Sequence, residues 1–201
     1  QSTLLLIKLA LETDCRKFIY ASTMSVYGDH PDVPITEEGS TFPKSLYGVG
    51  KIASEHYMRI YQQYGIEATS LRLFNVYGPG QNMKNLRQGM VSIYLEQALK
   101  NRHIIVKGSP DRYRDFVYID DVVNAFLAAL AKPQISYNVY NVATGVRTTV
   151  EELIAVVQKK LPFDVSVEYS VSTPGDQFGI YGNCSKSKKE LNWYSEVKLD
   201  I

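Results

Sequence analysis

Tyr47 and Lys51 are the residues whose types and spacing most directly suggest chemistry, because they stand four places apart in the stretch SLYGVGK. Side chains four residues apart lie on the same face of a helix. A tyrosine hydroxyl has an ordinary pKa of about 10 and is a poor base at neutral pH, but a nearby ammonium group stabilises its phenolate form. Such a pair can take a proton from a sugar or alcohol hydroxyl.

The spacing alone does not identify a site, because Tyr194 and Lys198 repeat it in YSEVK. In a chain with 15 tyrosines, about one such match is expected by chance. The residues around each pair must therefore decide which of the two pairs belongs to a site. Upstream of Tyr47, Ser22 and Thr23 close a predicted strand, and ligands bind at the carboxyl edge of strands in open α/β sheets. A hydroxyl there could hold the substrate oxygen, which favours the Tyr47 pair.

The elements that must position these residues alternate between helix and strand. The N-terminal residues read as an amphipathic helix, and KFIYAS (17–22) reads as a strand buried on both faces. After a polar loop, apolar residues recur at helical spacing over 46–64, and Gly65 ends the run as a C-cap does. ATSLRLFNVYG (68–78) then predicts one further buried strand. This order is typical of a doubly wound α/β sheet.

Shorter elements follow residue 80, and one of them carries a capping-box start, TVEE, at Thr149. Helices are expected over 89–101, 120–132, 148–160 and 185–193, and strands over 103–108, 115–119, 137–143 and 165–169. We therefore expect the C-terminal part of a Rossmann-type sheet in residues 1–80 and a smaller α/β substrate-binding domain in 81–201, with some of the latter segments returning to the first domain.

Composition narrows the function class. Lys and Arg number 22 against 21 acidic residues, so the charge balance does not indicate a nucleic-acid or membrane-surface protein. No apolar run is long enough to predict a transmembrane helix. Cys15 and Cys184 stand far apart, and neither they nor His30, His56 and His103 have metal-ligand spacing. A cytoplasmic protein without a metal is expected.

One part of a dinucleotide-binding sheet is missing. Such a sheet begins with a strand that runs into a glycine-rich turn, where backbone amides hold the pyrophosphate. The sequence contains no G-x-G-x-x-G or G-x-x-G-x-x-G, and it starts within a predicted helix. We expect the chain to be the C-terminal portion of a longer parent, and to be inactive and weak in cofactor binding on its own.

The motifs around Tyr47 resemble a known family. STMSVYG (22–28), YGVGK (47–51) and LRLFNVYGP (71–79) follow one another as in the extended short-chain dehydrogenases/reductases of the nucleotide-sugar epimerase and dehydratase group. RDFVYIDDVVNAFLAAL (114–130), YNVATG (140–145) and PGDQFGIYGNCSKSKKELNW (174–193) also resemble motifs of that group. The similarity extends over nearly the whole chain.

The resemblance implies a role for each matching residue. Tyr47 would be the acid/base, Lys51 would bind the nicotinamide ribose of NAD and stabilise the phenolate, and Thr23 would hydrogen-bond the reacting sugar hydroxyl. Ser22 would contact the cofactor together with Tyr47 and Lys51. The implied reaction is NAD-dependent epimerisation of a nucleotide sugar, at C4 of a UDP-hexose as in UDP-glucose 4-epimerases, through a transient 4-keto intermediate.

Dehydratases of this group usually carry acidic residues directly after the Ser/Thr, whereas this chain has Met24 and Ser25. Neither supplies the added acid and base that elimination of water requires, so the sequence favours epimerisation. A nucleotide-sugar dehydratase or reductase of the same family, and a catalytically silent sensor of dinucleotides or sugar nucleotides, remain alternatives.

The resemblance also implies substrate contacts by Asn75, Arg114, Val91 and Val106. Asn75 could instead be a turn former at a strand end, Arg114 could form a surface salt bridge, and the two valines could be ordinary core. The family usually has a second phosphate-binding arginine where this chain has Thr173. Either another cation replaces it, or the nucleotide sugar is not the usual UDP-hexose.

The predicted helix over 46–64 carries Tyr57, Ile60, Tyr61 and Tyr64, more apolar and aromatic surface than one sheet face needs. In the family this region often packs a homodimer. A homodimer through this helix is therefore expected.

Overall fold

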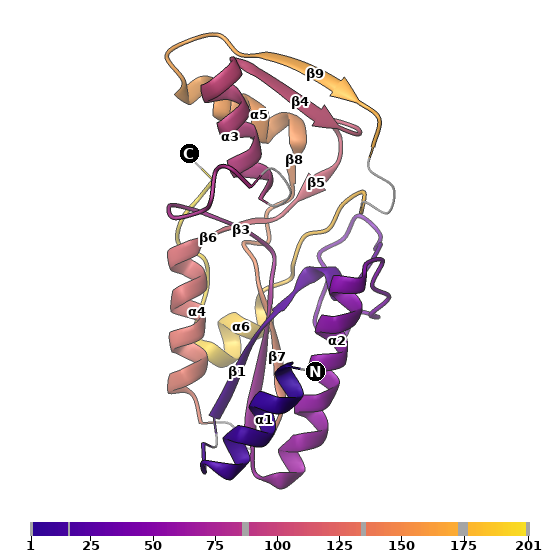
Figure 1. The fold of residues 1–201 in the computed structure, drawn as a ribbon, viewed down its shortest axis with the longest axis vertical. Helices are drawn as coiled ribbons and strands as arrows, with labels where there is room; N and C mark the ends of the chain where they lie inside the picture. Colours follow the sequence, from indigo (N-terminus) through magenta and orange to yellow (C-terminus); the bar gives the residue numbers. More distant parts are fainter. Residues whose placement is uncertain (1, 16, 86–88, 134–135, 173–176, 200–201) are drawn as a thin grey trace.

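The computed structural model describes residues 2–15, 17–85, 89–133, 136–172 and 177–199. In Figure 1 the described chain forms an elongated molecule with a lower part and an upper part. Its lower part is built on a parallel sheet with helices on both sides. Its upper part holds shorter strands packed with two helices.

The lower part centres on a three-stranded sheet in the order β1–β2–β7, in which both pairings are parallel. Its strands are β1 (Lys17–Thr23), β2 (Glu67–Leu73) and β7 (Asn138–Val142). Ser22 lies opposite Arg72 in the register, so β1 and β2 end at the same edge of the sheet. That edge is where the sequence placed the candidate site.

Helices cover both faces of this sheet (Figure 1). They are α1 (Ser2–Glu12), α2 (Leu46–Tyr61), α4 (Ile119–Ala131) and α6 (Ser185–Leu191). Side chains of a strand alternate between faces, and accordingly Ala68 of β2 packs with α1 and α2, whereas Leu71 packs with α4 and α6. The prediction of a doubly wound α/β fold is confirmed. Strand β7, which lies beyond residue 80, belongs to the first sheet.

The prediction of one continuous strand over 68–78 was wrong. The chain leaves the sheet after Leu73 and resumes as β3 (Asn75–Tyr77), which pairs in parallel with β6 (Phe116–Tyr118). Phe74 N–H still donates to the carbonyl of Val142, whereas Asn75 N–H donates to the carbonyl of Asp115 at 2.9 Å. The exchange of partner strand at this point turns Asn75 away from the first sheet and toward the upper part.

The upper part packs around one apolar core. Its elements are α3 (Met90–Asn101), β4 (His103–Lys107), β5 (Tyr113–Arg114), β8 (Thr148–Thr149), α5 (Val150–Lys160) and β9 (Ser166–Ser170). Strands β4 and β9 pair in parallel, and β5 and β8 pair antiparallel. The predicted capping box at the start of α5 is present, since Thr149 and Glu152 bond reciprocally. The domain boundary at residue 80 stays a prediction.

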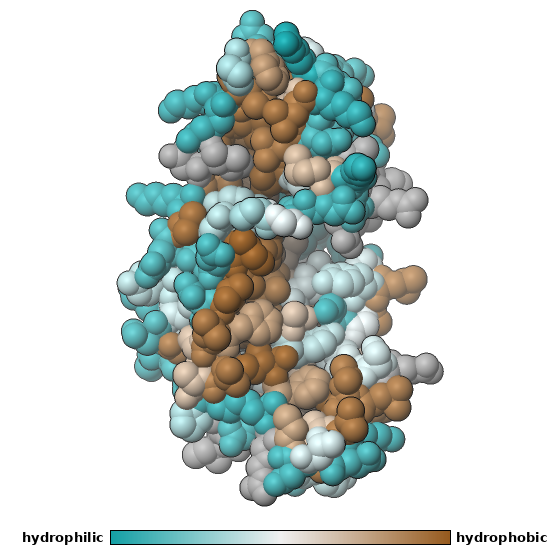
Figure 2. Space-filling model, turned by 60° about the vertical axis from the view of Figure 1, so that its left-hand side comes forward, coloured by the Kyte–Doolittle hydropathy of each residue, from teal (hydrophilic) through white to brown (hydrophobic). Residues whose placement is uncertain are grey.

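Exposed apolar residues gather on the outer face of α4. Val123, Leu127 and Leu130 are each about half exposed, and Figure 2, which brings this side forward, shows a hydrophobic stripe along the lower part. Among the described residues, no helix is both long and apolar enough to cross a membrane.

Candidate active site

A pocket of about 350 Å³ opens at the carboxyl ends of β1 and β2, between the two parts of the molecule. This volume is within the range of small-molecule sites. Its walls come from the end of β1, the first turns of α2, the β2–β3 junction and the start of α3. The lining residues are Ala21, Ser22, Thr23, Met24, Tyr47, Lys51, Leu73, Phe74, Asn75, Val76, Gln81, Gly89, Met90, Val91 and Phe116.

Thr23 stands at the last position of β1, where its side chain caps the following 3-10 turn, Met24–Val26. Its Oγ1 accepts the backbone N–H of Ser25 at 3.2 Å and donates to the Ser25 hydroxyl at the same distance. This short-range capping fixes the threonine hydroxyl at the pocket wall.

Helix α2 starts at the pocket because Ser45 caps it, accepting the N–H of Gly48 at 3.1 Å. Two residues into the helix, Tyr47 is 56% exposed, and Lys51 follows one turn later. Lys51 Nζ donates to the carbonyl of Ala21 at 2.7 Å and lies 5.5 Å from the centre of the Tyr47 ring. The ammonium group thus sits between the end of β1 and the tyrosine.

The structure therefore brings Thr23, Tyr47 and Lys51 together in one pocket, as their order and spacing predicted. Tyr194 and Lys198 lie beyond α6 in a segment without helical structure, so their spacing does not place them on one face. Neither of them lines the pocket.

Asn75 carries the clearest sign that this pocket receives a polar ligand. Its backbone N–H is held by Asp115, but its side-chain Oδ1 is buried and has no hydrogen-bond partner among the described residues. A buried acceptor without a partner is costly, so native structures rarely leave one. A ligand that donates an N–H or O–H group here would satisfy it, which fits both a nucleotide sugar and a dinucleotide cofactor.

The other predicted substrate residues do not all line the pocket. Val91 lines the pocket at the start of α3, whereas Val106 is fully buried in the core of the upper part. Arg114 is 4% exposed, and its guanidinium donates to the carbonyls of Gln177 at 2.7 Å and Phe178 at 3.1 Å. Neither Val106 nor Arg114 lines the pocket. Their substrate roles stay predictions.

Arg112 and Lys107 are cations that could replace a second phosphate-binding arginine, and Lys107 is exposed at the end of β4. Arg112 is buried, and its guanidinium donates to the carbonyls of Lys107 and Ser109. Thr173, at the position where the family usually has that arginine, lies outside the described residues. Among the residues that the structure describes, no three acidic, histidine or cysteine side chains group as a metal site would need.

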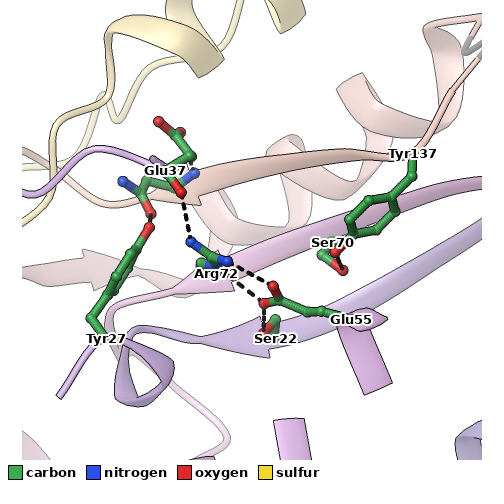
Figure 3. A network of polar contacts seen from close by, with 8 residues as sticks. Ser22, Tyr27, Glu37, Glu55, Ser70, Arg72 and Tyr137 are labelled. Carbon is green, nitrogen blue, oxygen red and sulfur yellow. Dashed lines mark hydrogen bonds and ion pairs between the residues drawn. The ribbon is translucent and has the colours of Figure 1, made fainter. Parts of the chain in front are cut away.

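Sequence reasoning missed the polar groups beneath the pocket. The hydroxyl of Ser22, expected to face a cofactor, donates instead to Glu55, which also pairs with Arg72 (Figure 3). Glu55 continues the four-residue spacing of Tyr47 and Lys51, and that repeat was the available signal. The cofactor contact of Ser22 stays a prediction, which its backbone could still fulfil from the pocket wall.

Comparisons with known proteins show which family this chain is similar to. The sequence model of the NAD dependent epimerase/dehydratase family matches residues 1–143. A putative UDP-glucose 4-epimerase of Methanocaldococcus jannaschii is 33% identical over 199 residues, which are 98% of this chain and 64% of that protein.

Solved structures show the same similarity. The UDP-glucose 4-epimerase of Thermotoga maritima, solved with UDP-glucose, gives a TM-score of 0.93 at 32% identity over 98% of this chain and 64% of its own. The UDP-glucose 4-epimerase of Thermus thermophilus, solved with NAD, gives 0.88 at 30% identity over 98% and 65%. The chain thus spans slightly less than two thirds of the length of these relatives.

Proposed function

The chain belongs to the NAD dependent epimerase/dehydratase family, and from that premise we propose that the complete gene product epimerises a nucleotide sugar at C4 of a UDP-hexose, with NAD as cofactor. The observation that carries the proposal is the meeting of Thr23, Tyr47 and Lys51 in one pocket. The wall of this pocket also holds Asn75, whose Oδ1 has no hydrogen-bond partner within the described part of the chain. These four side chains supply an anchor, a base, a cation and a polar contact.

Each residue has a physical task in this proposal. The Thr23 hydroxyl, fixed by its cap to the following turn, holds the reacting sugar hydroxyl. The exposed Tyr47 oxygen takes the proton of that hydroxyl, and the Lys51 ammonium stabilises the phenolate form that does so. The chemistry that bound NAD would supply is reversible hydride transfer at C4 of the sugar, which the proposed 4-keto form requires. Tyr47 then gives the proton back.

The residues present suit a nicotinamide ribose and a sugar. Lys51 has a mobile ammonium head that now donates to a backbone carbonyl, and it can donate equally to ribose hydroxyls at the same pocket wall. Asn75 Oδ1 can accept from the nucleotide sugar or the cofactor. The relatives are longer than this chain, and backbone amides at a helix N-terminus would hold the pyrophosphate in the complete gene product.

The character of the pocket wall favours epimerisation over dehydration. None of the described residues that line the pocket is an aspartate, glutamate or histidine. Met24 lines the wall directly after Thr23, and the Ser25 hydroxyl is bonded to Thr23. The added acid and base that elimination of water needs are therefore not provided by these residues.

The test is turnover by the complete gene product, supplied with NAD and UDP-glucose and assayed for the C4 epimer. Tyr47→Phe should lower kcat by about 10²–10⁴-fold, because it removes the proton-transfer group, while binding of the nucleotide sugar persists. Tyr194→Phe is the matched control, since it removes the tyrosine of the other four-residue pair, and it should leave turnover unchanged.

Other outcomes would point to the alternatives. Net oxidation or reduction of added nicotinamide would indicate a reductase, because epimerisation involves no net redox change. Binding of the nucleotide sugar without turnover in the wild type would indicate a sensor. Turnover that survives Tyr47→Phe would show that another group moves the proton.

We also propose a homodimer through α2. Leu46, Val49, Ile60 and Tyr64 of this region are about half exposed or more, whereas Tyr57 packs partly inward. Exposed apolar side chains along one helical region favour burial against a second copy. Sedimentation of the complete gene product as a monomer at micromolar concentration would contradict this. The cytoplasmic location expected from two dispersed cysteines, both free here, stays a prediction.

A further inference from the structure

A buried cluster of charged and polar side chains, shown in Figure 3, adjoins the pocket at Ser22, which is one of the lining residues. Glu55 accepts two bonds from Arg72, from Nη2 at 2.7 Å and from Nε at 3.1 Å, and a third from the Ser22 hydroxyl. All three residues are at most 5% exposed. The pair is therefore a fully bonded, bidentate ion pair in the interior rather than on the surface.

Stability alone is a weak explanation for such a pair. Removing two charges from water is costly, and well-packed apolar side chains of similar size often serve a core equally well or better. A buried ion pair instead imposes a fixed geometry on the elements that carry it, because both partners lose heavily when the contact is displaced. The side chains that are positioned by the elements carrying this ion pair therefore indicate its role.

Two members of the cluster are next to the reacting side chains. Glu55 lies on α2 one turn beyond Lys51 and two turns beyond Tyr47, on the same helical face. Ser22 directly precedes Thr23 on β1. The bond between Ser22 and Glu55 thus joins the strand that carries the hydroxyl anchor to the helix that carries the tyrosine and the lysine.

The third member extends this connection. Arg72 lies on β2, three residues before Asn75, and the two are separated only by the point where the chain changes sheets. Its Nη1 donates to the carbonyl of Glu37 at 3.1 Å, and its guanidinium stacks over the ring of Tyr27 at 4.7 Å. The cluster therefore ties β1 and α2, which bear Thr23, Tyr47 and Lys51, to β2, which leads into the segment that bears Asn75.

We propose that Glu55 is a positioning residue of the site, which holds α2 in the register on β1 and β2 that places Tyr47 and Lys51 against Thr23. The proposal rests on the function proposed above for those three residues. Glu55 touches neither substrate nor cofactor in this role, and it acts through the two elements that its carboxylate bridges.

The test separates positioning from mere stability. In the double variant Glu55→Leu/Arg72→Met, apolar side chains replace both charges, so the urea midpoint should stay near that of the wild type. Its kcat should nevertheless fall by about 10²-fold, because a shift of about 1 Å between reacting groups has an effect of that size. The KM for the nucleotide sugar should change far less than kcat.

The matched control is Tyr137→Phe. Tyr137 is also drawn in Figure 3, where its hydroxyl donates to Ser70 of β2 at 2.9 Å, and among the described residues that hydroxyl makes no hydrogen bond to β1 or α2. It should leave kcat unchanged. A folded double variant with wild-type kcat would overturn the proposal. If the double variant does not fold, Glu55→Asp keeps the charge but shortens its reach, and wild-type kcat in that variant would overturn the proposal equally.

A second measurement needs no turnover. In the unliganded double variant, backbone amides at Thr23–Met24 and in the first turn of α2 should exchange with deuterium faster than in the wild type, at unchanged global stability. Unchanged exchange there would contradict positioning by Glu55. If these amides loosen while the wild type proves to have no epimerase activity, the proposed function fails and the link between β1 and α2 stands.

Discussion

The approach of α2 to the turn after β1 can be tested with two glycines of the same helix. Gly48, directly after Tyr47, is buried, and a Cβ atom added there would lie 2.6 Å from the carbonyl oxygen of Ser25 and 2.8 Å from Cβ of Pro43. Ordinary contact begins at 3.4 Å. Gly50, two positions on, is exposed, and nothing lies within 4 Å of its added Cβ.

The two alanine substitutions should therefore change the free energy of unfolding in opposite directions. Each gains about 0.5–1 kcal/mol of helix propensity, and Gly50→Ala should show that gain as added stability. Gly48→Ala also incurs overpacking of about 1–3 kcal/mol, so its net effect should be a loss. The obstacle is the backbone oxygen of Ser25, which has no rotamer to change. Either the helix or the turn after Thr23 must move by several tenths of an ångström.

That displacement should also be visible in turnover. A movement approaching 1 Å between Tyr47 and Thr23 lowers kcat by about 10²-fold, whereas Gly50→Ala should leave kcat unchanged. Urea unfolding followed by circular dichroism measures the first effect, and the epimerase assay with the complete gene product measures the second. Equal stabilisation by both substitutions would refute the close packing of α2 on the turn after β1.

Two further predictions concern buried titratable groups. Burial raises the pKa of the Glu37 carboxyl above its ordinary value, so its contribution to stability is present at acid pH below that ordinary value and is lost as pH rises through the folded-state pKa. Glu37→Gln keeps the acceptor for the N–H of Asn141 and should raise the urea midpoint at neutral pH, whereas Glu37→Ala should lower it; equal losses in both would contradict this reasoning. Burial raises the pKa of the Cys184 thiol to about 12, so iodoacetamide at mildly alkaline pH should modify the exposed Cys15 and spare Cys184 until the chain is unfolded. The modification rate of each thiol is measured by mass spectrometry, and equal rates for Cys15 and Cys184 would contradict this prediction.

Much of the secondary structure could be predicted because its signals are local. The capping box at Thr149 and the left-handed Gly65, at φ 90°, mark a helix start and a helix end through contacts within a few residues. The apolar runs over 17–22 and 137–143 likewise indicated strands, which are present as β1 and β7, although only the last two residues of β1 are buried. The break at Phe74 could not be predicted, because LRLFNVY is mostly apolar and the change of partner from β1 and β7 to β6 depends on residues distant in sequence.

The sequence by itself determined the family and the candidate pair of Tyr47 and Lys51, since the motifs that carry the hydroxyl, the tyrosine and the lysine follow one another in a set order and spacing. Only the tertiary structure decided what those groups face. It left Asn75 Oδ1 without a partner among the described residues at the pocket, bonded the guanidinium of Arg114 to the carbonyls of Gln177 and Phe178, and placed Glu55 between Ser22 and Arg72. Hydrogen-bond partners and burial are set by contacts between segments far apart along the chain, and neither residue type nor spacing encodes them.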